Sequence, residues 1–314
     1  MAGRIAVIGS CMIDLVTYVA RMPAAGETLV APRFEMGFGG KGANQAIACA
    51  RLGSAVTMIA KVGDDEFGAN TLRNFAAEGI DARFVARVGG VSSGVAPIFV
   101  EPDGQNRILI VPGANEHLLP ADIDQAGEAL EGCALILLQL EVPLETVYHA
   151  IAWGARHGVP VLLNPAPAHP ALDLARIREA RFFVPNQSEL NLLTGMPTDT
   201  VESAERAART LLAAGLENVV VTLGGEGALW VSGGETRLIP PVPVTPVDTT
   251  GAGDAFIGSF AHHYVQSGDI DTALVAASRY AAQSITARGT QRSFPTAAAF
   301  AAFCAGLAAS RPPC

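Results

Sequence analysis

The segment Val247 to Phe256, VDTTGAGDAF, carries the residues best suited to phosphoryl chemistry. Glycines at the start of a predicted helix let backbone N–H groups converge on an anion, and the helix dipole adds about half a positive charge there. Gly251, Ala252 and Gly253 therefore predict an anion hole. A carboxylate beside such a hole would repel an anion, but Asp254 could serve as a base that accepts the proton of an attacking hydroxyl. From this motif alone, a simple helix cap remains an alternative.

A second glycine-rich segment, Gly37 to Gln45, has the sequence GFGGKGANQ and permits several interpretations. Its spacing matches the G-x-G-x-x-G pattern of dinucleotide-binding turns, and an acid follows at the distance expected for a ribose contact. The residues of that match are Gly37, Gly39, Gly42 and Asp64. However, the segment follows a predicted ribbon and not the first strand. The alternatives are a plain strand-to-helix turn, or a backbone close to a polyhydroxyl ligand with Lys41 and Asn44 as donors.

Two weaker motifs also follow predicted strands. Asn186 and Glu189 open a predicted helix and could orient hydrated Mg²⁺ near phosphates, although an isolated motif of this kind is more often a helix cap. The segment TLGGEG places small residues where a backbone could pass close to adenine or phosphate, or where a hairpin turns. Its residues are Thr222, Leu223, Gly224, Gly225, Glu226 and Gly227.

Apolar runs of strand length alternate with alanine-rich stretches of helical spacing. Runs that are apolar at successive positions are typical of parallel strands buried on both faces. Because no repeat or linker divides the 314 residues, we expect one α/β domain over 1–314, a doubly wound and mostly parallel sheet flanked by helices. The predicted strands are 5–8, 56–62, 134–140, 159–163, 182–184 and 219–223. The predicted helices are 43–52, 66–77, 144–157 and 203–214.

Two segments interrupt this alternation, Thr28 to Phe38 and Gly94 to Pro112, the second with Asp103-Gly104 at its predicted turn. They predict a small β-sheet lid, from about 12–38 and 93–113, that could cover a ligand at the carboxyl ends of the central strands. The exposed edge of such a ribbon also predicts pairing with a second copy, a homodimer formed through the lid.

Composition excludes several classes of protein. Half of the residues are hydrophobic and 16% are charged, which excludes general disorder. A net charge of −9 without a basic patch argues against nucleic acid as a partner. The apolar runs are far shorter than the roughly 20 residues of a membrane span, and we expect no export signal or lipid anchor. Five scattered cysteines without a C-x-x-C pair favour a reducing cytoplasm.

Taken together, five motifs resemble those of the ribokinase family of sugar kinases, in order and over nearly the whole chain. They are GGKGAN at 39–44, NPAPA at 164–168, PNQSE at 185–189, TLGGEG at 222–227 and DTTGAGD at 248–254, of which the first and last are specific. The segments most similar to family members that phosphorylate 2-deoxy-D-ribose lie at 9–18, 94–100, 138–151 and 253–269. The resemblance implies a ribokinase-like fold and ATP-dependent transfer to the 5-hydroxyl of 2-deoxy-D-ribose or D-ribose.

The resemblance also implies a role for each matching residue. Asp254 would be the catalytic base, and the backbone of Gly251, Ala252 and Gly253 would form the anion hole. The positions that match the sugar site are Met12, Asp14, Gly40, Lys41, Asn44, Glu141 and Asp254. Those that would border ATP are Asn186, Thr222, Leu223, Gly224, Gly225, Glu226, Gly227 and Gly253.

Two metal ions are implied by the same matches. Glu189 would act on Mg²⁺ through water. A monovalent cation, K⁺, would lie next to the anion hole, where a buried cation offsets phosphate charge. The positions that match the K⁺ site are Asp248, Thr250, Ser284, Ala287, Gly289 and Ser293.

Two departures from the family pattern concern specificity. Met12 replaces an asparagine found in many ribose-preferring members, and because a thioether scarcely pairs with a hydroxyl, it favours a deoxy sugar. Ser278 stands where many family members have an asparagine near adenine, so the resemblance does not assign an adenine contact to this position. Alternatives are another sugar or nucleoside kinase of the family, an NAD-dependent oxidoreductase using positions 37, 39 and 42, and a sugar-binding module without turnover.

Overall fold

A computed structural model describes residues 3–102 and 105–309. The strands of its larger sheet are β1 (Arg4–Ile8), β4 (Val56–Gly63), β5 (Asp81–Val88), β8 (Cys133–Leu138), β9 (Val161–Leu163), β10 (Phe182–Phe183), β11 (Asn218–Thr222), β12 (Ala228–Ser232) and β13 (Thr236–Ile239). The strands of the smaller sheet are β2 (Met12–Tyr18), β3 (Arg33–Gly39), β6 (Gly94–Val100) and β7 (Asn106–Ile108).

The helices connect these strands. They are α1 (Lys41–Arg51), α2 (Glu66–Ala77), α3 (Pro120–Gln125), α4 (Gly127–Glu131), α5 (Leu144–His157), α6 (Leu174–Ile177), α7 (Gln187–Thr194), α8 (Val201–Ala213), α9 (Ala252–Ser267), α10 (Ile270–Ser284) and α11 (Ala297–Ala309). Short 3-10 turns are η1 (Gly113–His117), η2 (Gly224–Glu226) and η3 (Gln291–Ser293). Among the helices of the described residues, none combines the length and apolar character needed to cross a membrane.

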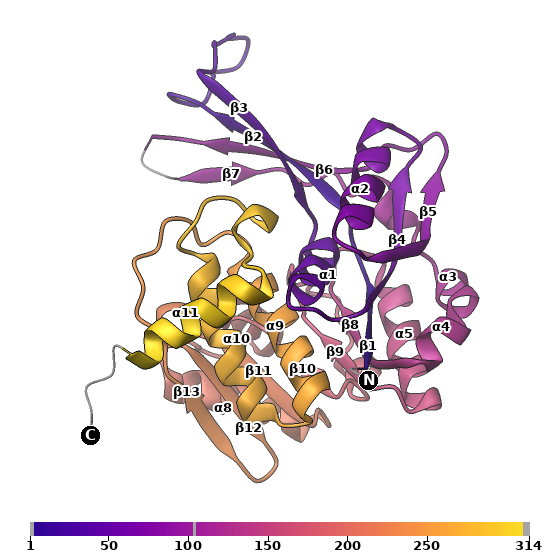
Figure 1. The fold of residues 1–314 in the computed structure, drawn as a ribbon, viewed down its shortest axis with the longest axis vertical. Helices are drawn as coiled ribbons and strands as arrows, with labels where there is room; N and C mark the ends of the chain where they lie inside the picture. The colour runs from indigo at the N-terminus through magenta and orange to yellow at the C-terminus, as the bar shows by residue number, and fades with distance from the viewer. Residues whose placement is uncertain (1–2, 103–104, 310–314) are drawn as a thin grey trace.

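The larger sheet has the order β13-β12-β11-β10-β9-β8-β1-β4-β5 and is parallel from β11 to β5, with β12 and β13 antiparallel at one edge. Figure 1 shows helices on both of its faces and the smaller sheet, ordered β3-β2-β6-β7, projecting from the body. This architecture confirms the predicted α/β class with a mostly parallel central sheet and a small separate sheet.

The sequence placed many elements correctly, missed β5, β12 and β13 of the larger sheet, and misjudged some ends. The strand predicted over 134–140 ends at Leu138, because both neighbouring strands end at the residues paired with it, β1 at Ile8 and β9 at Leu163. The ribbon predicted from Thr28 becomes a strand only at Arg33, since Pro32 has no N–H to donate to a ladder. Helix α8 begins two residues before the predicted Ser203, because the Thr200 side chain caps it. The predicted Asp103-Gly104 turn lies outside the described residues.

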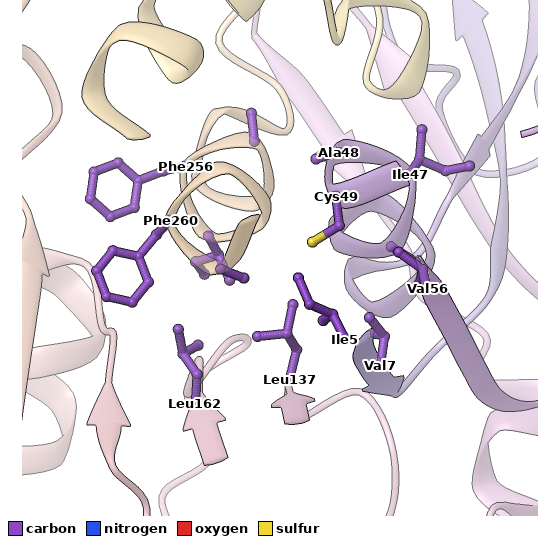
Figure 2. Close-up of a cluster of buried hydrophobic side chains, with 14 of the residues drawn as sticks. Ile5, Val7, Ile47, Ala48, Cys49, Val56, Leu137, Leu162, Phe256 and Phe260 are labelled. Carbon is purple, nitrogen blue, oxygen red and sulfur yellow. The ribbon is translucent and has the colours of Figure 1, made fainter. Parts of the chain in front are cut away.

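Helices α1 and α9 lie side by side over the middle of the sheet. Figure 2 shows α1 side chains (Ile47, Ala48, Cys49) and α9 side chains (Phe256, Phe260) above strand residues Ile5, Val7, Leu137 and Leu162. Gly258 allows the close approach: a Cβ there would lie 2.5 Å from the Ala48 Cβ and 2.9 Å from the Gln45 carbonyl oxygen. The Cys49 thiol donates to the Gly258 carbonyl oxygen at 3.3 Å. The first turns of the two helices are thereby brought together.

Gly258→Ala is expected to lower the free energy of unfolding by about 1–3 kcal/mol, because the added methyl group must push α9 away from α1. Chemical denaturation measures this change. The matched control is Gly127→Ala in α4, where a Cβ meets its nearest atom at 3.9 Å and is expected to be neutral or slightly stabilising. Equal stability of wild type and Gly258→Ala would contradict the role given to this glycine.

Candidate active site

A pocket of about 180 Å³ lies between the first turns of α1 and α9 and the ends of β9, β10 and β11. It is lined by Lys41, Asn164, Ala166, Val184, Asn186, Glu189, Thr222, Thr249, Gly251, Ala252, Gly253, Asp254 and Ile257. Eight of the thirteen were singled out from the sequence, in four separate motifs. Their convergence at the carboxyl ends of parallel strands is where open α/β sheets place their ligands.

A larger surface cavity of about 350 Å³ lies elsewhere, between α5 and α6. It contains none of the predicted site residues. Its Arg176 is already paired with Glu145 and stacked on Tyr148, with 4.0 Å between the guanidinium carbon and the ring centroid. We therefore assign the chemistry to the smaller pocket.

Asp254 lies in the first turn of α9 and is only 6% exposed. Asn44 Nδ2 donates to its Oδ2 at 2.8 Å, and Gln45 Nε2 donates to its Oδ1 at 3.1 Å. Both donors come from the first turn of α1, so the carboxylate is fixed from the α1 side. Its neighbours Gly251, Ala252 and Gly253 line the pocket, and the N–H groups of a first helical turn lack helical acceptors. The Ala252 N–H is engaged with the Thr249 carbonyl at 3.2 Å.

Lys41 lies among buried carboxylates. Burial would lower the pKa of Lys41, but the negative charges of Asp254, Glu141 and Glu189 outweigh burial and hold that pKa above its ordinary value. Burial raises the pKa of Glu141, although Lys41 and the hydroxyl of Ser10, at 2.5 Å, favour its charged form. Burial likewise raises the pKa of Glu189. The pocket therefore concentrates negative charge around a single ammonium group of its lining.

Asp14 extends this charge cluster from the small sheet. Burial raises its pKa to about 7, and the charges of Glu141 and Asp254 add to the rise. In the ladder between β2 and β3, Met12 pairs with Gly39 and Asp14 with Gly37, so Met12 and Asp14 share one face of the small sheet. Because the charges of Glu141 and Asp254 act on Asp14, these three carboxylates form a charged patch beside the pocket.

Gly40, predicted as a sugar contact, is the residue before α1 and has φ 87°. A Cβ there would lie 2.8 Å from the backbone nitrogen of Met12. Backbone packing alone therefore requires a glycine at this strand-to-helix turn, which is the simpler of the sequence interpretations.

The motif at Asn186 to Glu189 is a capping box. The Asn186 side chain accepts from the Glu189 N–H, and the Glu189 carboxylate accepts from the Asn186 N–H, both at 2.8 Å. The helix-cap interpretation therefore holds, yet both side chains also line the pocket.

The glycine-rich segment after β11 is the hairpin turn that the sequence allowed. Thr222 lines the pocket, whereas Leu223 is buried in the core. The remaining residues of the motif, Gly224, Gly225, Glu226 and Gly227, form η2 and the residue that precedes the antiparallel strand β12, outside the pocket lining.

Asp248 joins the two loops that carry the residues matched to a cation site. Its carboxylate accepts from the Gly289 N–H at 2.9 Å and from the Thr250 N–H at 3.0 Å. Burial would raise the pKa of Asp248, but these N–H groups hold it below its ordinary value. The hydroxyls of Ser284 and Ser293 donate to carbonyls of their own turns. Within the described residues, no group of three or more His, Cys, Asp or Glu side chains could hold a metal ion.

Sequence reasoning gave no role to Gln45, Asn164, Ala166 or Thr249. Asn164 lies in the pocket and receives a hydrogen bond from Gln45 Nε2 at 3.3 Å. The position of Asn164 directly after a buried strand was the signal that could have identified it, because side chains at strand carboxyl ends face ligand sites. Gln45 sits within a quoted motif, but its partner is 209 residues away in the sequence.

Comparison with known proteins defines the family. The description "pfkB family carbohydrate kinase" matches residues 2–297, so the chain belongs to this family of carbohydrate kinases. The deoxyribokinase of Salmonella typhi is 56% identical over 292 residues, covering 93% of this chain and 95% of the relative. The ribokinase of Bacillus subtilis is 41% identical, covering 93% and 96%.

A solved structure of Arabidopsis thaliana ribokinase, complexed with ribose and ATP, superimposes with a TM-score of 0.91 at 30% identity, covering 96% of this chain and 99% of that one. The dinucleotide interpretation does not fit these findings, since Gly37 and Gly39 lie in β3 of the small sheet.

Asp14→Asn is expected to gain stability relative to wild type as the pH rises from about 4 to about 7. The folded protein holds the Asp14 proton more tightly than the unfolded chain, so the ionised carboxylate costs stability that is absent below pH 4 and fully felt above pH 7. Urea denaturation at pH 4, 5.5 and 8 measures the difference, expected to grow by on the order of 1 kcal/mol or more. Glu202→Gln, at an exposed position of α8, is the control. A difference that does not vary with pH would refute the charged cluster.

Proposed function

We propose that this protein is an ATP-dependent pentose kinase that phosphorylates the 5-hydroxyl of 2-deoxy-D-ribose, with D-ribose as the competing substrate. The observation that carries the proposal is the buried Asp254 carboxylate, fixed by two amides at the start of α9 beside the glycine-rich turn. The 56% identity to a deoxyribokinase over 93% of the chain supports the choice of sugar. The ATP complex of the Arabidopsis relative supports the phosphoryl donor.

In the proposed reaction, Asp254 accepts the proton of the sugar hydroxyl as that oxygen bonds to the γ-phosphorus of ATP. The bond from phosphorus to the β,γ-bridging oxygen breaks, and ADP leaves. The N–H groups at Gly251, Ala252 and Gly253 would stabilise charge on the migrating group, and the Ala252 N–H would have to exchange its Thr249 acceptor for the phosphate. Lys41 balances the carboxylates that surround the sugar site.

Sugar recognition in this proposal uses the charged patch beside the pocket. A carboxylate accepts hydrogen bonds when it is ionised, so Asp14, with a pKa of about 7, and Glu141 suit hydroxyl donors in their charged forms. Gly40, Lys41 and Asn44 complete the predicted sugar side.

On the nucleotide side, the proposal assigns ATP contacts to Asn186 and to the segment from Thr222 to Gly227, with Thr222 as the member that lines the pocket. Mg²⁺ would be held by Glu189 through water, and the ion would offset phosphate charge. The Asn186 N–H occupies one carboxylate oxygen of Glu189, Oε2, which leaves Oε1 to face a hydrated ion.

A K⁺ ion next to the anion hole is part of the same proposal. The residues that would hold it offer carboxylate, hydroxyl and carbonyl oxygens, the hard donors that such cations prefer. They are Asp248, Thr250, Ser284, Ala287, Gly289 and Ser293. The hydrogen bond from the Gly289 N–H to Asp248 joins the two loops involved and supports a shared site.

We further propose that residues 1–314 form one domain in which the small sheet, within about 12–38 and 93–113, closes over the sugar. By the ladder register, Leu15, Phe34 and Met36 face away from Asp14, on the other side of the small sheet. Phe34 and Met36 are 60% and 42% exposed. Clustered exposed apolar side chains indicate an interface, which supports the predicted homodimer through the lid.

A cytoplasmic location belongs to the proposal as well. Cys11, Cys49, Cys133 and Cys304 are free thiols, and the first three are buried. A reducing compartment keeps such thiols unpaired.

Met12→Asn is expected to lower the ratio of kcat/KM for 2-deoxyribose to that for ribose by about 10-fold or more, because an amide offers the 2-hydroxyl a partner that a thioether lacks. Met12 is 4% exposed, on the same face as Asp14. Met12→Leu, which stays apolar, is the control and should keep the wild-type ratio. An unchanged ratio in Met12→Asn would remove Met12 from the choice of sugar.

The central test is release of ADP from MgATP in the presence of 2-deoxyribose, ribose or a nucleoside, measured with a coupled assay. Wild type is expected to prefer 2-deoxyribose, and Asp254→Asn should lose at least 10²-fold in kcat, as expected for a positioned base. Asp269→Asn, which removes the capping carboxylate of α10, serves as the control. Wild type that releases no ADP with any sugar would instead support a binding module without turnover.

A further inference from the structure

Asp254 is the end point of two chains of side-chain amides, and this inference rests on its proposed role as the base. In the first chain, Gln139 Nε2 donates to Gln45 Oε1 at 2.6 Å, and Gln45 Nε2 donates to Asp254 Oδ1 at 3.1 Å. The same Gln45 nitrogen also reaches Asn164 Oδ1 at 3.3 Å, and Asn164 Nδ2 donates to the Val184 carbonyl at 2.9 Å. This chain runs from the end of β8, through α1, to the pocket.

The second chain approaches the other carboxylate oxygen. Asn74 Nδ2 donates to Gln291 Oε1 at 3.0 Å, and Gln291 Nε2 donates to Asn44 Oδ1 at 3.0 Å. Asn44 Nδ2 then donates to Asp254 Oδ2 at 2.8 Å. Each carboxylate oxygen thus receives one amide, and both amides come from adjacent residues of α1.

The direction of both chains follows from the carboxylate. An ionised carboxylate only accepts, so Gln45 must turn its NH₂ group to Asp254 and its oxygen to Gln139, which must in turn donate. That orientation leaves Gln139 Oε1 buried without a hydrogen-bond partner. Gly9 makes room for it, since a Cβ on Gly9 would lie 2.0 Å from this oxygen.

Such an arrangement is costly for a group that merely fills space. Gln45 and Gln139 are both fully buried, and a buried amide with an unpaired oxygen is less favourable than an apolar side chain of the same shape. Chains of hydrogen bonds that point the same way polarise one another, which strengthens the last donor at the carboxylate. The hydrogen bond from Gln45 to Asp254 therefore offsets the unfavourable free energy of burying these amides.

We propose that Gln45 is a positioning residue for Asp254. Its amide fixes Oδ1 from the α1 side and directs the remaining lone pairs of the carboxylate into the pocket, toward the sugar hydroxyl. Gln139 donates to Gln45 on the side away from Asp254 and has a smaller effect on catalysis. Without Gln139, Asp254 and Asn164 still accept from Gln45 Nε2 and so keep its amide in the same orientation.

The test compares Gln45→Met and Gln139→Met, two substitutions of equal size at fully buried neighbours. Gln45→Met is expected to lower kcat by about 10-fold or more and to leave KM for the sugar within about 2-fold. Gln139→Met is expected to lower kcat by less than about 3-fold and also to leave KM for the sugar within about 2-fold.

Asn218→Leu is the control for loss of a buried amide outside the site, since Asn218 bonds Trp230 and the Arg181 carbonyl. Thermal unfolding of all three variants separates loss of folding from loss of rate. If Gln45→Met keeps the wild-type kcat, or if it behaves like Asn218→Leu at equal stability, the positioning role is wrong. If wild type itself releases no ADP, or if Asp254→Asn stays active, it is the proposed function that fails.

Discussion

The close contact between the first turns of α1 and α9 is the constraint on which the site depends. Because Gly258 has no side chain, the two helices approach closely, and the amides of Asn44 and Gln45 reach the Asp254 carboxylate. The apolar core beneath both helices holds them against the sheet (Figure 2). A hydrogen bond from an amide to a buried carboxylate forms only when the donor–acceptor distance is within a few tenths of an ångström of its normal value. The packing of α1 against α9 therefore determines whether Asp254 is held in place.

Charge is the second constraint. Burial raises the pKa of Asp14, Glu141 and Glu189, whereas Lys41 stays charged because these carboxylates and Asp254 surround it. A pocket with this charge favours ligands that donate hydrogen bonds, such as sugar hydroxyls, and needs cations before it accepts phosphates. One cluster of side chains therefore explains both the proposed sugar and the proposed metal ions.

The two faces of the small sheet differ, and each supports a different part of the proposal. One face brings Asp14 and Met12 to the body, and the other exposes Phe34 and Met36. Alternation along a strand assigns these faces strictly, so a shift of register by a single residue would exchange them. The Asn115 side chain opposes such a shift. Its Oδ1 accepts a hydrogen bond from the Cys11 N–H and its Nδ2 donates one to the Cys11 carbonyl, just before β2, each at 2.9 Å.

The sequence by itself determined the α/β class, the parallel strands of the central sheet except β5, the helix starts at Gly251 and Asn186, and the carboxylate at 254. These features depend on hydrophobic period, glycine and capping residues that act within a few positions of the chain. Only the tertiary structure decided that Gln45 donates to Asp254 and that Gln139 donates to Gln45. It also decided that several carboxylates lie near Lys41. Contacts such as that of Asn44 with Asp254, 210 residues apart, depend on the strand order and on the distance between two helices. Local sequence patterns determine neither of these.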